Sequence, residues 1–506
     1  MLDYCADNGG RFISRGNLVL SLLLLLTTLL ALSWNFEEPS SLNTITVLLL
    51  VFGFGTFSIR RARRTGIVIS EVEWMTMFFV KIVVSFLITK YLWTLPLSPH
   101  YLRVGPNQGG LQDSNGYDLQ GMMLAEEGTS ASLFGLWLDF GVVRYISLIY
   151  RVFGVSVLYV SMFNALLSLV GTLFIVGIFR ILDEKNLAKW QLLKLVMLLP
   201  SGAYYDATPS KEPLTFLAFY ASAYFFLKLY WSRKHRRQSL IYLAGTLLLL
   251  GLVRLNVLFL FTSAMLAFLI IRAKKISIAK RFWWSLMTAV LSLVALTVSY
   301  TVVFNDTPSW ENVRGTFFDL ERRAEMLEYQ VSMKEDSENS IKMRVANLLV
   351  PRDLKDYIVF SPIRPLVWLY LPFPLLFPDI SKIVNLPTLV STDYRQYVAL
   401  TVQWFPVLSA WIMIFLTPFV MAFFLSRVNR KSDTLAFLVT LFAVTVFLIS
   451  NLHVIETVRY RSLIEPLFVS FALWGYIHNK SLLYTLPIWF MFFMVIGSVY
   501  LYRSIS

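Results

Sequence analysis

The chain has 506 residues, of which 57% are hydrophobic and only 15% are charged, and its formal net charge is +14. Soluble globular domains have about 25% charged residues, so the composition predicts an integral membrane protein and excludes an ordinary soluble chain. The positive charge fits basic loops on the cytoplasmic side of a multispan protein, so we do not expect nucleic acid as a partner. The single cysteine, Cys5, excludes an intramolecular disulfide framework and a thiolate metal cluster.

Apolar segments recur along the whole chain, and a membrane-spanning helix needs about 20 mostly apolar residues. By this measure the sequence predicts an all-α protein with about 13 transmembrane helices, in one membrane domain covering residues 1–506. The predicted spans are 17–35, 43–59, 73–95, 153–179, 190–206, 212–230, 238–253, 256–271, 282–304, 397–425, 434–451, 460–477 and 482–502. The first segment lacks a small-residue cleavage site, so we interpret it as a retained span and not as a removed signal peptide.

Basic residues follow every second predicted span, from the second to the twelfth. They are Arg60, Arg61, Arg63 and Arg64; Arg180, Lys185, Lys189 and Lys194; Arg233, Lys234, Arg236 and Arg237; Arg272, Lys274, Lys275, Lys280 and Arg281; Arg427, Arg430 and Lys431; and Lys480. The positive-inside rule then predicts a cytoplasmic N-terminus. The loops after odd-numbered spans are expected to face outside, and they contain nearly all of the unusual polar residues.

Two of the predicted outer loops are long. The loop 96–152 contains an amphipathic stretch at 133–150 that is suited to lie flat in the membrane interface. The loop 305–396 begins with charged residues at helical spacing and ends in the proline-rich segment 361–380. The prolines exclude a regular span, so we interpret 361–380 as a re-entrant or interfacial segment.

The first outer loop carries an acid-bearing segment at 112–128. Within it, Asp113 and Asp118 flank Tyr117. A carboxylate can act as a general base or bind a divalent cation. Five residues apart, these two acids lie nearly half a turn from each other on a helix, so we do not expect a close pair. Solvated loop acids are the alternative interpretation.

Two other stretches place basic side chains on the same predicted face. Lys211 and Glu212 begin the sixth span between two prolines, where a helix N-terminus beside a lysine favours an anionic group such as phosphate. The alternative is a Lys–Glu pair that snorkels at the interface. Arg254 interrupts a long apolar stretch, where a guanidinium is expected to pair with an anion or to cap the turn of a helical hairpin.

A last polar cluster lies at the start of the twelfth span. It consists of His453, Glu456, Arg459, Arg461 and Glu465. Charges buried there must pair with one another or with a substrate. A lone histidine beside one glutamate is not a metal site, and the chain contains no HExxH motif, phosphate-binding loop, nucleophile elbow or dinucleotide fingerprint.

Several stretches resemble the GT-C superfamily of membrane glycosyltransferases. DSNGYDLQGMMLAEEG is similar to the first outer loop of that family, and YRVFGVSVLYVSMFNALLSL to the span that follows it. LLPSGAYYDATPSKEPLTFLAFYASAYF is similar to a Lys-Glu-bearing segment of bacterial members, and RYRSLIEPLFVSFALWGY to the late RY…P span. The resemblance implies a GT-C-like bundle with large outer loops, in which Asp113 is the catalytic base and an arginine of the late span lies near the lipid phosphate.

Residues and resemblance together predict a multi-pass glycosyltransferase of the bacterial cytoplasmic membrane, active on the outer face in cell-envelope or exopolysaccharide synthesis. The expected partners are a polyprenyl-phosphate-linked sugar as donor, a glycan, lipid or protein as acceptor, and membrane lipid. Asp113 is the expected catalytic residue, and the expected substrate-binding residues are Tyr117, Asp118, Lys211, Glu212, Arg254, His453, Glu456, Arg459 and Arg461. A divalent cation, Mg or Mn, is the one cofactor that the sequence leaves open.

Two other functions remain open. An oligosaccharide repeat-unit polymerase would share the Lys-Glu segment and the outward arginines, and would use a whole lipid-linked glycan as donor. A transporter or lipid flippase predicts inverted repeats and charges near the membrane midplane, and the sequence contains no internal repeat. Lys81 is the one residue within a span that favours transport, although we expect its side chain to snorkel to the interface.

Overall fold

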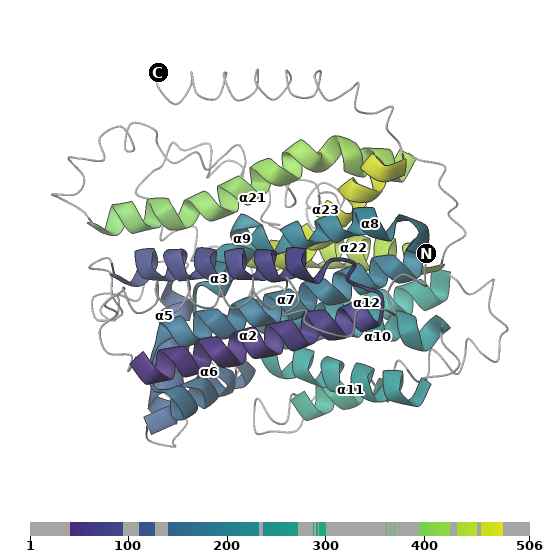
Figure 1. Cartoon of the computed structure of the whole chain (residues 1–506). Coiled ribbons are helices and arrows are strands. Elements are labelled where there is room, and N and C mark those ends of the chain that lie inside the picture. Colours follow the sequence, from purple (N-terminus) through teal and green to yellow (C-terminus); the bar gives the residue numbers. More distant parts are fainter. Residues whose placement is uncertain are drawn as a thin grey trace, which may run out of the picture.

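The computed structural model describes residues 41–94, 111–126, 140–231, 236–271, 394–425, 433–452 and 457–478, with single positions and short runs at 287–299 and 361–369. Every element in these ranges is a helix (Figure 1). The helices are α2 Ser41–Arg64, α3 Glu71–Thr94, α5 Leu111–Glu126, α6 Phe140–Phe153, α7 Val157–Leu182, η3 Glu184–Asn186, α8 Leu187–Trp190, η4 Gln191–Leu198, α9 Pro200–Asp206, α10 Glu212–Trp231, α11 Arg236–Val253, α12 Leu255–Ile271, α21 Tyr394–Leu425, α22 Asp433–Leu452 and α23 Thr457–His478.

Five of these helices are long and apolar enough to cross a membrane: α2, α3, α7, α10 and α22. Shorter apolar stretches lie in α12 and at 408–424 in α21. For the described part of the chain, the predicted all-α fold with membrane-spanning helices is therefore confirmed. The number of about 13 spans stays a prediction, because 17–35, 482–502 and most of 282–304 lie outside the described residues.

The predicted span 190–206 is wrong as a continuous helix. The chain there forms α8, then eight residues of the tighter 3-10 helix in η4, and then the seven-residue α9. Pro200 provides the physical reason, since it lacks a backbone N–H and forces the preceding residue into extended backbone. Leu199 accordingly has φ −55° and ψ 132°.

The first outer loop contains two helices. α5 covers the acid-bearing segment, and α6 covers the second part of the predicted amphipathic stretch 133–150. Leu148 and Val152 of α6 are exposed, while Ile146 and Ile149 are buried, so α6 has the expected two faces. The position of α6 in a membrane interface remains a prediction, and 361–380 lies almost entirely outside the described residues.

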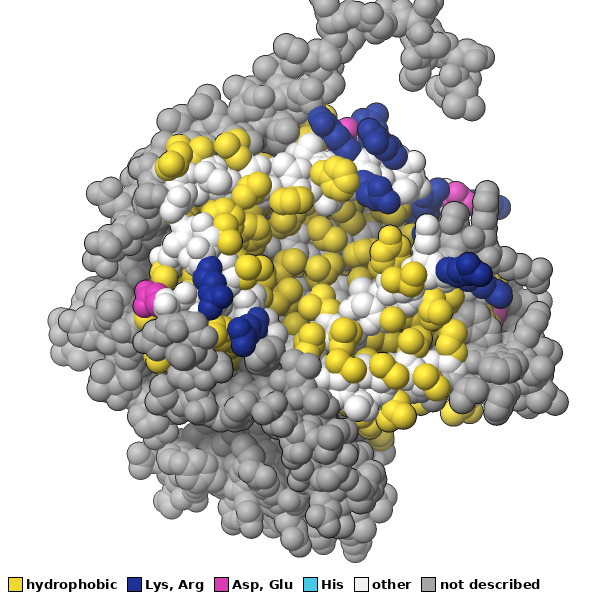
Figure 2. All heavy atoms as spheres, turned by 90° about the horizontal axis from the view of Figure 1, so that it is seen from below, with side chains coloured by type: hydrophobic (Ala, Val, Ile, Leu, Met, Phe, Trp, Pro, Cys, Tyr) yellow, Lys and Arg dark blue, Asp and Glu magenta, His cyan; other side chains and the backbone are white. Residues whose placement is uncertain are grey.

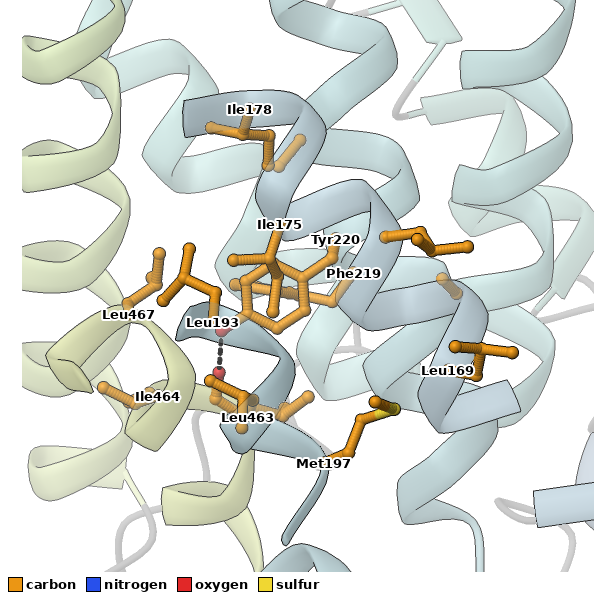
Figure 3. Packing of buried hydrophobic residues seen from close by; sticks show 14 of the residues in the cluster. Leu169, Ile175, Ile178, Leu193, Met197, Phe219, Tyr220, Leu463, Ile464 and Leu467 are labelled. Atoms are coloured by element: carbon orange, nitrogen blue, oxygen red, sulfur yellow. Dashed lines mark hydrogen bonds between the residues drawn. The ribbon is translucent and has the colours of Figure 1, made fainter. Parts of the chain in front are cut away.

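The core forms where α7, η4, α10 and α23 meet (Figure 3). Tyr220 of α10 is fully buried and donates a hydrogen bond of 2.6 Å from its hydroxyl to the carbonyl oxygen of Leu463 in α23. Side chains of α7 and η4, such as Ile175 and Leu193, fill the space around the ring. This contact ties the late helix α23 to the middle of the chain.

Basic clusters that are distant in the sequence lie at one end of the bundle. Arg180, at the end of α7, lies against Gly66 in the turn after α2. The end of α10 meets the start of α22, where Trp231 donates a 2.8 Å hydrogen bond to Thr434. Asp183, just after α7, also lies against the end of α23, with 3.6 Å between its Oδ2 and Nε2 of His478. We refer to this as the basic end, and the positive-inside rule predicts that it is cytoplasmic.

The face formed by α2, α6 and α11 exposes large apolar side chains. Figure 2 shows a broad hydrophobic surface with Lys and Arg side chains at its edges. Its exposed residues include Leu49, Phe54, Phe57, Leu148, Val152 and Ile241. A soluble monomer rarely exposes so continuous an apolar surface, so this face is suited to contact lipid chains.

Close packing of α21 on α23 depends on Gly475. A Cβ at this position would overlap the carbonyl oxygen of Phe419. We predict that Gly475→Ala lowers the free energy of unfolding by about 1–3 kcal/mol, because backbone must shift to admit one methyl group. Gly245→Ala in α11 is the matched control, since nothing lies within 4 Å of its Cβ. Thermal unfolding in detergent tests this, and equal melting temperatures for both variants would contradict it.

Candidate functional site

The segment 199–212 joins η4 to α10 and is held by side chains from neighbouring helices. Thr89 of α3 donates a hydrogen bond of 2.9 Å to the carbonyl oxygen of Ala207. Asn164 of α7 donates one of 3.0 Å to the carbonyl oxygen of Thr208. These bonds satisfy backbone groups that no helix uses, which is the condition for irregular backbone inside a membrane protein.

Within this segment, Asp206 of α9 forms an ion pair with Lys81 of α3. Lys81 is 0% exposed and Asp206 only 2%. The Ser168 hydroxyl lies 2.8 Å from both carboxylate oxygens of Asp206. The expectation that Lys81 snorkels is therefore wrong. The residue lies ten positions into α3, about 15 Å from its start, and an acid at that depth keeps the ammonium there.

A small cavity of about 30 Å³ lies beside the ion pair. Its lining includes Lys81, Ser168, Ser201, Asp206 and Glu212. A water molecule needs at least about 10–15 Å³ of such volume and several polar partners, so the cavity can hold about two waters. It is too small for a sugar or a phosphate group.

Glu465 of α23 is also buried, with 1% of its surface exposed. Its carboxylate accepts a hydrogen bond from Ser201 at the start of α9. Ser409 of α21 donates a second bond of 3.3 Å to the same oxygen and accepts one of 3.0 Å from the backbone N–H of Ser201. The carboxylate thus fixes α9 against α21 and α23.

Lys211 and Glu212 follow α9, and their side chains contact different helices. Glu212 is buried and pairs with Arg254, with 3.4 Å between its Oε1 and the guanidinium Nη1. Lys211 extends toward α5, and its Nζ lies 5.8 Å from the centre of the Tyr117 ring. A Lys–Glu pair at the interface is therefore not formed. Arg254 occupies the turn between α11 and α12, so it also lies in the turn of the helical hairpin that these two helices form.

Asp118 is buried in the contact between α5 and α6 and accepts a hydrogen bond from the Tyr150 hydroxyl. Burial, reinforced by the Asp118 carboxylate, raises the pKa of Tyr150 well above its usual value, so the phenol stays protonated as a donor. A solvated loop acid is therefore the wrong interpretation of Asp118. The hydrogen bond from Tyr150 to Asp118 orients α5 against α6. A role of Asp118 in substrate binding stays a prediction.

The predicted residues fall into two groups. The structure brings Tyr117, Lys211, Glu212 and Arg254 together where α5, α10 and the α11–α12 turn meet, with Asp118 on the same helix as Tyr117. The other predicted residues lie outside the described side chains. Asp113 is in α5, Arg459 and Arg461 are in α23, and His453 and Glu456 precede that helix.

Sequence reasoning missed Asp206 and Ser168 and did not link Lys81 to an acid. One signal was present: Lys81 and Asp206 each interrupt apolar sequence, and opposite charges at membrane depth are expected to pair. Within the described ranges, no three His, Cys, Asp or Glu side chains come together to hold a metal ion.

No protein-family model matches the chain, and neither does any curated protein.

We predict that Lys81→Met and Asp206→Asn each lower the free energy of unfolding by about 3–5 kcal/mol, because each leaves a buried charge without its partner. The double variant should lose clearly less unfolding free energy than the two single variants lose together. Lys185→Met, at an exposed lysine of the basic end, is the control and should change stability by less than about 1 kcal/mol. Strict additivity in thermal unfolding would show that the two side chains do not interact.

Proposed function

We propose that the protein is a GT-C-like glycosyltransferase that moves a sugar from a polyprenyl-phosphate-linked donor to an acceptor hydroxyl at the membrane surface. The donor carries an anionic phosphate and an apolar polyprenyl tail, so the site must offer a cation next to lipid-facing helices. The acceptor hydroxyl needs a base. The chain supplies both kinds of group at the junction of α5 with α10.

The contact between Lys211 and Tyr117 carries this proposal. It joins the two stretches that resemble the first outer loop and the Lys-Glu segment of that superfamily, although almost one hundred residues of sequence separate them. Asp113 lies one helical turn before Tyr117 in α5. Positions four apart share a helix face, so we expect position 113 to lie on the same side of α5 as Tyr117.

The charges around this junction have different environments. Arg254 is 4% exposed and pairs with the buried Glu212, so much of its charge is already compensated. Lys211 is partly exposed, so a substrate can reach its ammonium, which lies over the Tyr117 ring. We therefore assign Lys211 to the donor phosphate, and Arg254 with Glu212 to the position of the start of α10.

In the reaction, the acceptor oxygen bonds to the anomeric carbon of the sugar while the bond from that carbon to the phosphate oxygen breaks. The Asp113 carboxylate takes the proton of the acceptor hydroxyl. Polyprenyl phosphate leaves with an added negative charge, which Lys211 stabilises in the transition state. Arg459 and Arg461, at the start of α23, are proposed as further contacts of the lipid phosphate.

The proposal includes a site that faces outward from the bacterial cytoplasmic membrane, with the orientation taken from the positive-inside rule. A repeat-unit polymerase would use the same groups and would yield a ladder of products instead of one added sugar. Transport has one specific observation in its favour, namely the buried Lys81–Asp206 pair about halfway along α3. Uptake of solute into sealed vesicles, without sugar transfer, would favour that second function.

We predict that Asp113→Asn lowers the rate of sugar transfer by about 100-fold or more, because the general base is lost. Lys211→Gln should lower it by about 10- to 100-fold, because the leaving phosphate loses its cation. The measurement is transfer of radiolabelled sugar from a panel of polyprenyl-phosphate donors by the purified protein in nanodiscs, with membrane glycolipids as acceptors.

Glu126→Gln is the matched control, since it removes an exposed carboxylate at the far end of α5. Its rate should equal that of the unchanged protein. Full activity of a folded Asp113→Asn variant would remove the assigned base. Absence of transfer and of saturable binding with every donor in the panel would remove the proposed function itself.

A further inference from the structure

The lipid-facing side of α2 carries a notch. Leu49, Gly53 and Phe57 are spaced four residues apart and so follow one face of the helix. Leu49 and Phe57 are 51% and 61% exposed, and a Cβ built on Gly53 meets nothing within 4 Å. The glycine therefore leaves a gap between two apolar side chains on a surface that no described helix covers.

The notch belongs to a hollow of about 590 Å³ on this side of α2. Its lining changes along the helix, from Leu49 and Phe57 to Arg60, Arg61 and Arg64 in the last turns. All of its described lining residues belong to α2 or directly follow it, so the hollow is an open groove along this helix. Apolar groups at membrane depth followed by arginines match a ligand with an apolar chain and an anionic head.

The end of α2 carries four arginines, at positions 60, 61, 63 and 64. Arg60 and Arg63 share one carboxylate, that of Glu71, at 2.7 and 3.1 Å. Arg61 and Arg64 are both exposed, and both line the hollow. Guanidinium groups bind phosphate oxygens in a two-pronged geometry, so the cluster is suited to a phosphodiester.

We propose that the end of α2 binds an anionic phospholipid, with its phosphate on Arg61 and Arg64 and an acyl chain in the notch at Gly53. The order of groups along α2 favours a lipid over free phosphate, because free phosphate would not use the apolar notch. The inference is independent of the proposed glycosyl transfer and concerns the opposite end of the bundle. It assigns a lipid-binding role to arginines that the positive-inside rule treats as orientation signals only.

The test is binding of phosphatidylglycerol to the full chain. Purified protein in nanodiscs of phosphatidylcholine with increasing phosphatidylglycerol is released into detergent, and bound lipid is counted by native mass spectrometry. R61Q/R64Q and Gly53→Leu should each weaken retention of phosphatidylglycerol about tenfold or more, the first through the phosphate and the second by filling the notch. The unchanged protein should prefer phosphatidylglycerol to phosphatidylcholine.

K185Q/K189Q is the charge-matched control, because both lysines are exposed near the basic end and neither lines the hollow. It should retain phosphatidylglycerol within about twofold of the unchanged protein. Equal loss in R61Q/R64Q and in this control would indicate general charge attraction and overturn the site. Retention unaffected by Gly53→Leu, or competition by inorganic phosphate alone, would overturn the acyl-chain contact. Cross-linking of the hollow to the first 40 residues would identify a different occupant.

Discussion

The buried ion pair between Lys81 and Asp206 is the constraint on which the functional end of this molecule depends. Two opposite charges removed from water are stable only while they remain together, so α9 cannot leave α3 without a large free-energy cost. Ser168 adds α7 to the same contact. The segment 199–212 therefore keeps one position among the helices, although its backbone is irregular and it contains one short helix.

The position of the candidate site follows from this constraint. Because the segment ends at α10, fixing it also fixes Lys211 and Glu212, whose side chains reach α5 and Arg254 respectively. Glu465 holds the other end of α9 through two serine hydroxyls. The buried ion pairs provide rigidity, whereas Lys211, the proposed contact of the donor phosphate, is partly exposed beside α5. This division of roles underlies the proposed chemistry.

The helical class could be predicted because long apolar runs allow few other structures in a membrane. The periodicity of the stretch 133–150 likewise agrees with the amphipathic helix α6. The break at Leu199 and Pro200 was missed, since overall hydrophobicity there resembles that of a span. The pairing of Glu212 with Arg254 could not be predicted from the adjacent Lys211, because neighbouring residues on a helix point in different directions. The Lys81–Asp206 pair joins positions 125 residues apart, and only the folded arrangement of α3 with α9 brings them together.

The most direct measurement is photo-cross-linking with a polyprenyl-phosphate sugar whose sugar ring carries a photoreactive group. The labelled peptides are then mapped by mass spectrometry, with and without excess unlabelled donor. The account predicts saturable labelling of α5 and of the residues around Lys211, abolished by competing donor. Labelling confined to the arginine-rich end of α2, or labelling that donor does not compete, would contradict a donor site at the junction of α5 and α10.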